Sequence, residues 1–250
     1  MSNRFDTTFK NYEISPVHRD SPTLAKTAAI FENEQDLNIC DVGCGAGHFG
    51  LKLSPSAKSI TFVDPSEKML SLLKEKTAGA EGLHFVQSTA EKLDFPSESF
   101  DVVVTRLATH HFSNIQQSVA EMVRVLKKGG HLIINDLSGY EDPRLDEINH
   151  QIEVLHDPTH GRSYKPSQWK SFLTLPDLEI EDFKFSLESP SGITIDFWCS
   201  ITKVGQDKCD SIKHILNTFT EQDLKELGYS KKDGELLNGV KTVYIIARKV

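Results

Sequence analysis

The stretch Ile39-Cys-Asp-Val-Gly-Cys-Gly-Ala-Gly47 decides the fold of this chain. A short apolar run ends at Asp41, and glycines follow at alternate positions, Gly43, Gly45 and Gly47. Glycine adopts positive φ and lets the backbone approach a ligand closely, while free amides at the start of a helix attract polar or anionic groups. The stretch therefore predicts a strand, a ligand-binding turn and then a helix.

Around this turn, short apolar runs alternate with amphipathic stretches, which is typical of βαβ units. The sequence predicts strands at Leu37–Val42, Ser59–Asp64, Leu83–Gln87, Phe100–Thr105, His131–Asp136, Ile180–Leu187 and Thr242–Arg248. These strands predict an α/β fold. We expect a Rossmann-like, doubly wound sheet of seven mostly parallel strands with an antiparallel last strand, an N-terminal helical lid and insertions.

Helices are expected between the strands. Ser66 is a candidate N-cap, and Met69, Leu70, Leu72 and Leu73 follow it on the inner side of one helix. A second helix places a buried stripe at Val119, Met122, Val123 and Leu126 and is expected to stop at Lys127–Gly130, where glycine can form the cap. We expect mainly helix and loop in Ser138–Asp177, and an irregular region with one helix near Ser211–Leu227 in Pro190–Val240.

The whole chain, residues 1–250, is predicted to form one domain. Its parts are an N-terminal lid (1–36), a ligand-binding core (37–136), a substrate-side insertion (137–178), and C-terminal strands with a cap (179–250).

Composition restricts the classes of partner. The net charge of -8 argues against nucleic acid, because phosphate binding normally needs a concentrated basic surface. No apolar run is long enough to suggest a membrane span, and the N-terminus lacks the apolar core of a secretory signal. The four cysteines, Cys40, Cys44, Cys199 and Cys209, show no zinc-like spacing, so we expect no metal and a reduced, cytoplasmic protein.

An acidic residue at the end of the second strand fits a nucleoside ligand. Asp64 follows Gly47 by 17 residues, and a carboxylate there can accept hydrogen bonds from both hydroxyls of a ribose. Gly45, Gly47 and Gly50 also match the GxGxxG pattern of dinucleotide sites, which alone is weak evidence. Asp41 would face a pyrophosphate unfavourably and suits a cationic group such as the amino group of a methionine moiety. Sterics and charge favour a methyl donor over NAD.

Four motifs in this order resemble those of class I S-adenosylmethionine-dependent methyltransferases. Asp41–Gly47 resembles their first motif, and Phe62-Val-Asp64 resembles their second-strand acid. Ser88–Pro96 followed by Phe100-Asp101 resembles their adenine-side segment, and Arg124–Gly130 resembles the turn before their fifth strand. Within this class, the chain resembles the subgroup of ubiquinone/menaquinone-biosynthesis-like enzymes, also called methyltransferase type 11. The segments that carry this likeness are Tyr12–His18, Arg106–Phe112, His156–Tyr164 and Trp169.

The resemblance implies S-adenosylmethionine as the cofactor. Gly43 and Gly45 would line its methionine part, Asp64 would hold the ribose, and Ala90 would offer its backbone amide to the adenine. Thr89 stands where many relatives carry aspartate, so a charge-assisted contact to the adenine is lost unless Glu91 replaces it. The expected donor-binding residues are Asp41, Gly43, Cys44, Gly45, Gly47, Asp64, Pro65, Met69, Thr89, Ala90, Glu91 and Arg106.

Methyl transfer from a sulfonium needs alignment and exclusion of water, and it needs a general base only if the nucleophile arrives protonated. His111 and His110 follow the fourth strand at the ligand-binding edge and are the candidate catalytic residues, unless both simply pack in a loop. The candidate substrate-binding residues are Tyr12, His18, His156, His160, Arg162 and Tyr164. The alternatives are a solvated loop for the last four, and packing on the sheet for the N-terminal segment.

The predicted function is transfer of a methyl group from S-adenosylmethionine to O, N or C of a small-molecule acceptor, by a monomer or homodimer. Two alternatives remain at this point. An NAD-dependent oxidoreductase would bind NADH at the Gly45–Gly50 turn, and a non-catalytic adenosine-ligand-binding protein would bind the donor without transferring its methyl group.

Overall fold

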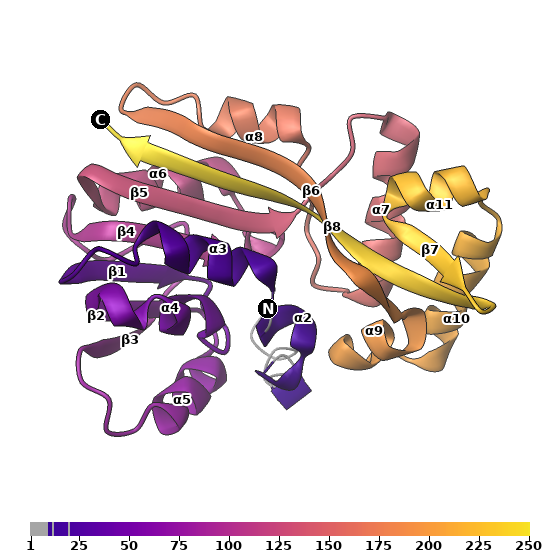
Figure 1. Cartoon of the computed structure of the whole chain (residues 1–250), viewed down its shortest axis with the longest axis horizontal. Helices are drawn as coiled ribbons and strands as arrows, with labels where there is room; N and C mark the ends of the chain where they lie inside the picture. Colours follow the sequence, from indigo (N-terminus) through magenta and orange to yellow (C-terminus); the bar gives the residue numbers. More distant parts are fainter. Residues whose placement is uncertain (1–9, 12, 20) are drawn as a thin grey trace.

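One continuous sheet runs through the chain. The computed structural model describes residues 10, 11, 13–19 and 21–250. Neighbouring strands of the sheet follow the order β3-β2-β1-β4-β5-β8-β6, and β7 pairs with β8 beside this path (Figure 1). The strands are β1 (Leu37–Val42), β2 (Ala57–Asp64), β3 (Leu83–Gln87), β4 (Phe100–Arg106), β5 (Leu126–Leu137), β6 (Leu178–Thr194), β7 (Tyr229–Lys232) and β8 (Glu235–Lys249).

Strands β1 to β5 pair in parallel, and β8 runs antiparallel to β5, β6 and β7. The reversal of strand order beside β1 puts the glycine turn at the point where open α/β sheets bind ligands. The predicted Rossmann-like fold with an antiparallel last strand is therefore confirmed, and the short β7 is an additional strand.

Helices cover both faces of the parallel part. On one face α3 (Pro22–Ile30), α4 (His48–Lys52) and α5 (Glu67–Lys76) enclose a core that includes Leu24, Phe49 and Leu73. On the other face α6 (Ile115–Val125) and α8 (Pro166–Phe172) pack over a second core that includes Met122 and Trp169. Apolar stripes facing the sheet from both sides account for this layered packing.

Of two helix ends predicted from the sequence, the start of α5 is confirmed and the end of α6 is not. Ser66 caps α5 as predicted, with its Oγ accepting from the Met69 amide at 3.2 Å. The predicted helix stop at Lys127–Gly130 is wrong, because α6 ends at Val125 and Leu126 is already extended, paired with Phe100 of β4. The chain enters β5 and pairs with β4 at the place where a helix cap formed by glycine was expected.

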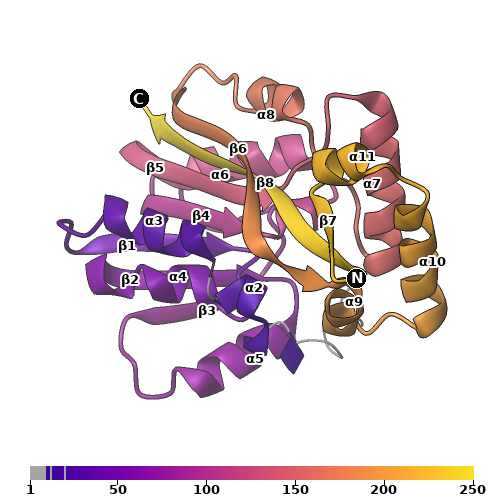
Figure 2. The same ribbon diagram turned by 45° about the vertical axis from the view of Figure 1, so that its right-hand side comes forward.

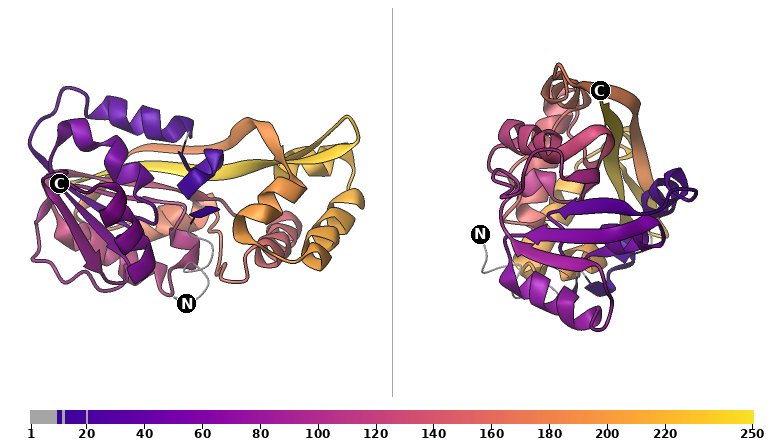
Figure 3. Two further views of the ribbon diagram at one scale, coloured as in Figure 1. Left: turned by 90° about the horizontal axis from the view of Figure 1, so that it is seen from below. Right: turned by 90° about the vertical axis from the view of Figure 1, so that its left-hand side faces the viewer.

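The long strands β6 and β8 continue beyond the parallel sheet and carry a second layer of helices (Figure 2). These are α7 (Pro143–His156), α9 (Ile195–Thr202), α10 (Gln206–Asn217) and α11 (Glu221–Leu227). Together with β7 and the adjoining ends of β6 and β8 they form what we call the cap, at the opposite end of the long axis from β1–β3 (Figure 3). The cap has its own apolar core, which includes Tyr140, Ile152, Trp198 and Leu227.

The expectation of an irregular Pro190–Val240 region with a single helix is wrong. Its glycines delimit regular elements: Gly205 is the N-cap of α10, and Gly228 ends α11 at a φ of 83°. Asp233 and Gly234, both at positive φ, form the turn between β7 and β8. Glycine at helix ends and in tight hairpins serves these conformations without steric cost.

The N-terminal helix α3 packs on the sheet. Thr23 Oγ1 donates to Asn135 Oδ1 at 2.9 Å, and the Thr27 hydroxyl meets the Tyr244 hydroxyl at 2.9 Å. The preceding short helix α2 (Pro16–Arg19) lies nearer the cavity described below. Within the part of the chain that the structure describes, every helix is too short or too polar to cross a membrane.

Candidate active site

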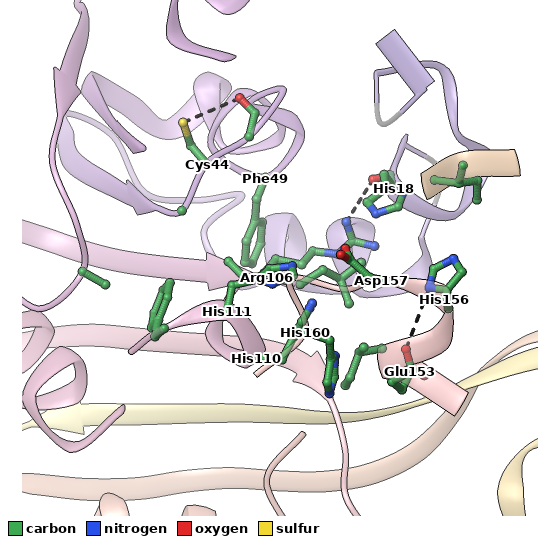
Figure 4. Close-up of a pocket in the computed structure, with 18 of the residues that line it drawn as sticks. His18, Cys44, Phe49, Arg106, His110, His111, Glu153, His156, Asp157 and His160 are labelled. Carbon is green, nitrogen blue, oxygen red and sulfur yellow. Dashed lines mark hydrogen bonds and ion pairs between the residues drawn. The ribbon is translucent and has the colours of Figure 1, made fainter. Parts of the chain in front are cut away.

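A cavity of about 290 Å³ extends from the glycine turn to the cap. The turns after β1, β2 and β4 line one side of it, which we call the donor side because the sequence predicts that the methyl donor binds there. Helices α7 and α9 and the start of β7 line the other side, the cap side. The carboxyl ends of neighbouring parallel strands meet at one edge, and long β6 and β8 bring the cap over that edge. Figure 4 shows charged and imidazole side chains pointing into this space from both sides.

The glycine turn lines the cavity through its first half. Gly43 and Gly45 have φ of 68° and 51°, values that side chains rarely adopt. A Cβ built on Gly45 would meet no atom within 4 Å, so it would enter the cavity. A Cβ on Gly47 would instead lie 2.5 Å from Leu73, and one on Gly50 would lie 2.6 Å from Phe62. Gly47 and Gly50 thus serve packing, and Gly45 leaves room for a ligand.

The two strand-end acids occupy different places. Asp64 lines the cavity, and its oxygens accept from the Gly45 amide at 2.9 Å and the Ser66 amide at 2.8 Å. Asp41 lies beneath the turn, 1% exposed, and accepts from the Gly50 amide at 2.8 Å. Burial raises the pKa of Asp41 to about 7, only partly countered by that hydrogen bond. Asp41 therefore shapes the turn from outside the cavity wall.

The predicted adenine-side segment also lines the cavity, through Ser88, Thr89, Ala90 and Glu91. Glu91 Oε1 already accepts from the backbone amides of Ser113 and Asn114, at 2.6 and 3.1 Å. This carboxylate is thereby committed to the start of α6. Its replacement of the aspartate missing at Thr89 stays a prediction.

Arg106 connects the N-terminal segment to the donor side. Its Nη1 donates to the carbonyl oxygen of His18 at 3.0 Å, and both residues line the cavity. Burial and the neighbouring Arg106 charge lower the pKa of His18 to about 3, so its imidazole is neutral at physiological pH. Tyr12 lies outside the described residues.

His110 is held by a buried carboxylate that the sequence analysis did not identify. His110 Nδ1 lies 2.5 Å from Oδ1 of Asp136, which is 0% exposed at the end of β5. Asp136 also accepts from the amides of Ala108, Thr109 and Leu137, at 2.9, 2.5 and 2.6 Å. These donors fix the carboxylate, which in turn fixes the imidazole.

The backbone before His110 makes this contact possible. Leu107, directly after β4, has a φ of 49°, which is uncommon for a residue with a side chain. The turn it creates leads into a short 3-10 helix at Thr109–His111. Both the Ala108 and Thr109 amides consequently face Asp136, with His110 beside them.

His110 and Asp136 shift each other's pKa in opposite directions. Burial disfavours the imidazolium of His110, but the Asp136 charge and hydrogen bond outweigh burial and raise its pKa above the ordinary value. Burial likewise opposes ionisation of Asp136, yet His110 and the surrounding donors lower the pKa of the carboxyl to about 2. Asp136 therefore stays charged and keeps the proton of His110 on Nδ1.

The other histidines near His110 are neutral. Burial and the His110 charge lower the pKa of His111 to about 4, and its Nδ1 donates to the Thr159 carbonyl at 3.0 Å. Burial and the same charge lower the pKa of His160 to about 2, and its ring stacks 5.1 Å from that of His110. The pKa of His110 is thus raised by its carboxylate partner, whereas those of His111 and His160 are lowered.

The predicted substrate residues of the insertion divide into two groups. His156 and His160 line the cavity, together with Glu153 and Trp198, which sequence analysis missed. Arg162 and Tyr164 do not line it: Arg162 pairs with Asp146, and Tyr164 packs against Trp169 and Phe172. Asn149, Glu153 and His156 recur on one side of α7, a polar stripe that could have indicated a cavity-facing surface.

Residues 40–134 match a family model described as a methyltransferase domain. An uncharacterized methyltransferase of Bacillus subtilis, YcgJ, is 34% identical over 213 residues, which cover 83% of this chain and 79% of that protein. The chain belongs to the S-adenosylmethionine-dependent methyltransferases. This membership favours the methyl donor over NAD for the glycine turn.

Other relatives of this methyltransferase extend the likeness to the predicted subgroup. The ubiquinone/menaquinone biosynthesis C-methyltransferase of Campylobacter jejuni is 30% identical over 43% of this chain and 48% of that protein. The solved YcgJ structure has a TM-score of 0.79 at 28% identity and covers 90% of this chain and 96% of that one. A putative methyltransferase from Bacillus halodurans gives 0.82 at 27%, with shares of 90% and 98%.

The donor side of the methyltransferase fits S-adenosylmethionine. The open space beside Gly45 suits the methionine part, and the Asp64 carboxylate at the edge of the same space suits a ribose. Within the described ranges, no group of three or more histidine, cysteine or acidic side chains is arranged to hold a metal ion.

Proposed function

We propose that this methyltransferase acts on a small molecule whose reacting atom arrives protonated, with His110 as the general base. The observation that carries the proposal is the 2.5 Å contact between His110 Nδ1 and Asp136 Oδ1 beside the cavity. A carboxylate accepts only, so the proton of neutral His110 stays on Nδ1 and Nε2 offers a lone pair. A base with a pKa near neutrality is efficient at physiological pH.

Bound S-adenosylmethionine supplies an electrophilic methyl group on a sulfonium. Asp64 and the open space at Gly45 would hold it, and the neighbouring turns would exclude water from it. His110 Nε2 would accept the proton from the acceptor oxygen, nitrogen or carbon as that atom forms its new bond. Asp136 would stabilise the resulting imidazolium and keep the ring oriented.

The geometry favours His110 over His111 for this role. His111 Nδ1 is bound to a backbone carbonyl, whereas His110 Nδ1 is bound to a carboxylate whose charge stabilises a second proton. Burial and the His110 charge also lower the pKa of His111 to about 4, which makes it a weaker base. With its single proton donated to that carbonyl, neutral His111 can still accept one hydrogen bond at Nε2 from the substrate.

The test replaces His110 with glutamine and follows methyl transfer from labelled S-adenosylmethionine across a library of hydroxyl, amine and carbon-acid acceptors. We expect His110→Gln to lose about 100-fold or more of the rate on any acceptor found for the wild type. Affinity for S-adenosylhomocysteine, measured by calorimetry, should change by less than about twofold, since the donor is expected to be held by Asp64 and the glycine turn rather than by His110.

The matched control is His84→Gln, because His84 is exposed on β3 and does not line the cavity. A full rate in His110→Gln with intact donor binding would remove His110 as the base. Tight S-adenosylhomocysteine binding by the wild type, without transfer to any acceptor, would favour the non-catalytic adenosine-ligand alternative.

A further inference from the structure

Glu153 is a buried carboxyl group without a hydrogen bond. It lies on α7, 8% exposed, and lines the cavity. Across residues 10–11, 13–19 and 21–250, no backbone or side-chain group donates a hydrogen bond to its carboxyl oxygens; the nearest ionisable partner is His156, whose Nδ1 lies 4.0 Å from Oε2. The carboxyl oxygens are not fully enclosed, and the residue lines the cavity, where a donor group on a ligand could reach them.

His156 does not satisfy Glu153. His156 Nε2 lies 3.1 Å from the carbonyl oxygen of Trp198, which can only accept, so Nε2 donates to it. His156 Nδ1 lies 4.0 Å from Glu153 Oε2, which is beyond hydrogen-bond distance. Figure 4 shows both side chains at the cap side of the cavity, with a dashed line that marks their 4.0 Å contact, and His110 and His160 line the same cavity.

The electrostatic environment of Glu153 is acidic. Its pKa is raised to about 7, chiefly by burial; the charge of His110 opposes the rise, and the charges of Asp157 and Asp136 contribute to it. Arginine and lysine are absent from the described groups that influence this carboxyl. Two carboxyl groups, those of Glu153 and Asp157, thus line this part of the cavity, while Asp136 lies behind the wall and is paired with His110. A cation in this space would restore the balance of charge.

The wall beside Glu153 is apolar and aromatic. The Trp198 ring stacks on His156 at 3.7 Å and 12°, and Tyr229 meets Trp198 edge-on at 6.4 Å. Ile201 and Leu227 line the same side of the cavity. In such surroundings an ion pair is stronger than in water, because little solvent screens it. A ligand with a flat apolar body and one cationic group fits this wall.

We propose that the cap recognises an acceptor carrying a basic amino group, which binds Glu153 as an ammonium while its apolar body packs along Trp198, Ile201 and Leu227. This inference rests on the proposed function, because it names the acceptor class of the same cavity. A hydroxyl group would donate one hydrogen bond but leave the acidic environment unbalanced. An ammonium supplies both the missing donors and the missing charge.

The experiment measures binding of matched amine and alcohol probes to the complex with S-adenosylhomocysteine, by calorimetry at pH 7.5. The pairs are benzylamine with benzyl alcohol, 2-phenylethylamine with 2-phenylethanol, and tryptamine with tryptophol. We expect at least one amine to bind about tenfold or more tightly than its alcohol. Glu153→Gln should abolish that preference, because glutamine keeps the shape and hydrogen-bonding capacity without the charge.

The matched control is Glu147→Gln, an exposed glutamate on the same helix, which should keep the preference. Retained S-adenosylhomocysteine affinity shows that Glu153→Gln is folded and that Glu153 binds the acceptor rather than the donor. Equal binding of amines and alcohols, no amine bound, or a preference that survives in Glu153→Gln would each overturn the proposal. His110→Gln should retain amine binding, so failure of the general base and failure of the amine site give different results.

Discussion

At the scale of single residues, the orientation of His110 depends on Asp136. The carboxylate receives donors from three backbone amides and the Thr109 hydroxyl besides the imidazole. Such a group is held before any substrate arrives, which is how a positioned base avoids the cost of reorganisation during reaction. The charge of Asp136 has a second effect, because it sets the pH range in which His110 is a free base.

Asp136→Asn should lower the pKa of His110. In the wild type the Asp136 charge outweighs burial and raises that pKa above 6.5; without the charge, burial dominates and the pKa falls below 6.5. A proton-resolved NMR titration, with the His110 resonance assigned by its loss in His110→Gln, measures both values without an acceptor. In a methyl-transfer assay the acidic limb of kcat/KM should move to lower pH while the maximal rate falls.

The exposed Asp94, whose side chain is 68% accessible, gives the control variant Asp94→Asn. An unchanged His110 pKa in Asp136→Asn, with S-adenosylhomocysteine binding retained, would contradict the pairing.

At the scale of secondary-structure elements, sequence patterns worked where they are local. Strands β1 and β3 were predicted to their ends, because apolar runs bounded by turn residues specify buried strands. The prediction for the cap was wrong because glycines are also typical of irregular chain. In this structure Gly205 and Gly228 mark the ends of helices instead. His110 was identified from its place after a strand, but Asp136 and Glu153 join it only through the fold.

The glycine turn gives a prediction at this scale. Gly47 has a φ of 75° and a Cβ position 2.5 Å from Leu73 of α5, so Gly47→Ala should disturb packing of α4 against α5. We expect a loss of about 1–3 kcal/mol in the free energy of unfolding, measured with urea. Gly45→Ala meets no protein atom and should lose less stability, yet weaken S-adenosylhomocysteine binding more. The opposite ranking would contradict the division of roles within the turn.

At the scale of the whole molecule, the cap and the parallel sheet enclose ionisable groups between them. Glu153 comes from the cap, whereas His110 and Asp136 come from the edge of the sheet. Because these groups are buried only when the two parts are folded together, their protonation is coupled to the stability of the entire chain. Glu153 contributes to this coupling on the acidic side of neutrality, since its pKa is raised from 4.5 to about 7.

The direction in which stability changes with pH follows from the raised pKa of the Glu153 carboxyl group. The unfolded chain releases the Glu153 proton near pH 4.5, whereas the folded chain retains it until about pH 7. The stabilising contribution of Glu153 is therefore fully present below pH 4.5 and lost as pH rises through 7, by about 3 kcal/mol in total.

Glu153→Gln should remove this loss while keeping His110, Asp136, Asp157 and His156. Urea unfolding at pH 5 and pH 8 should show the variant gaining on the wild type at pH 8 by about 2–3 kcal/mol. An equal stability difference at both pH values would mean that Glu153 is solvated in the free protein, and the acidic space between cap and sheet would then need no cation.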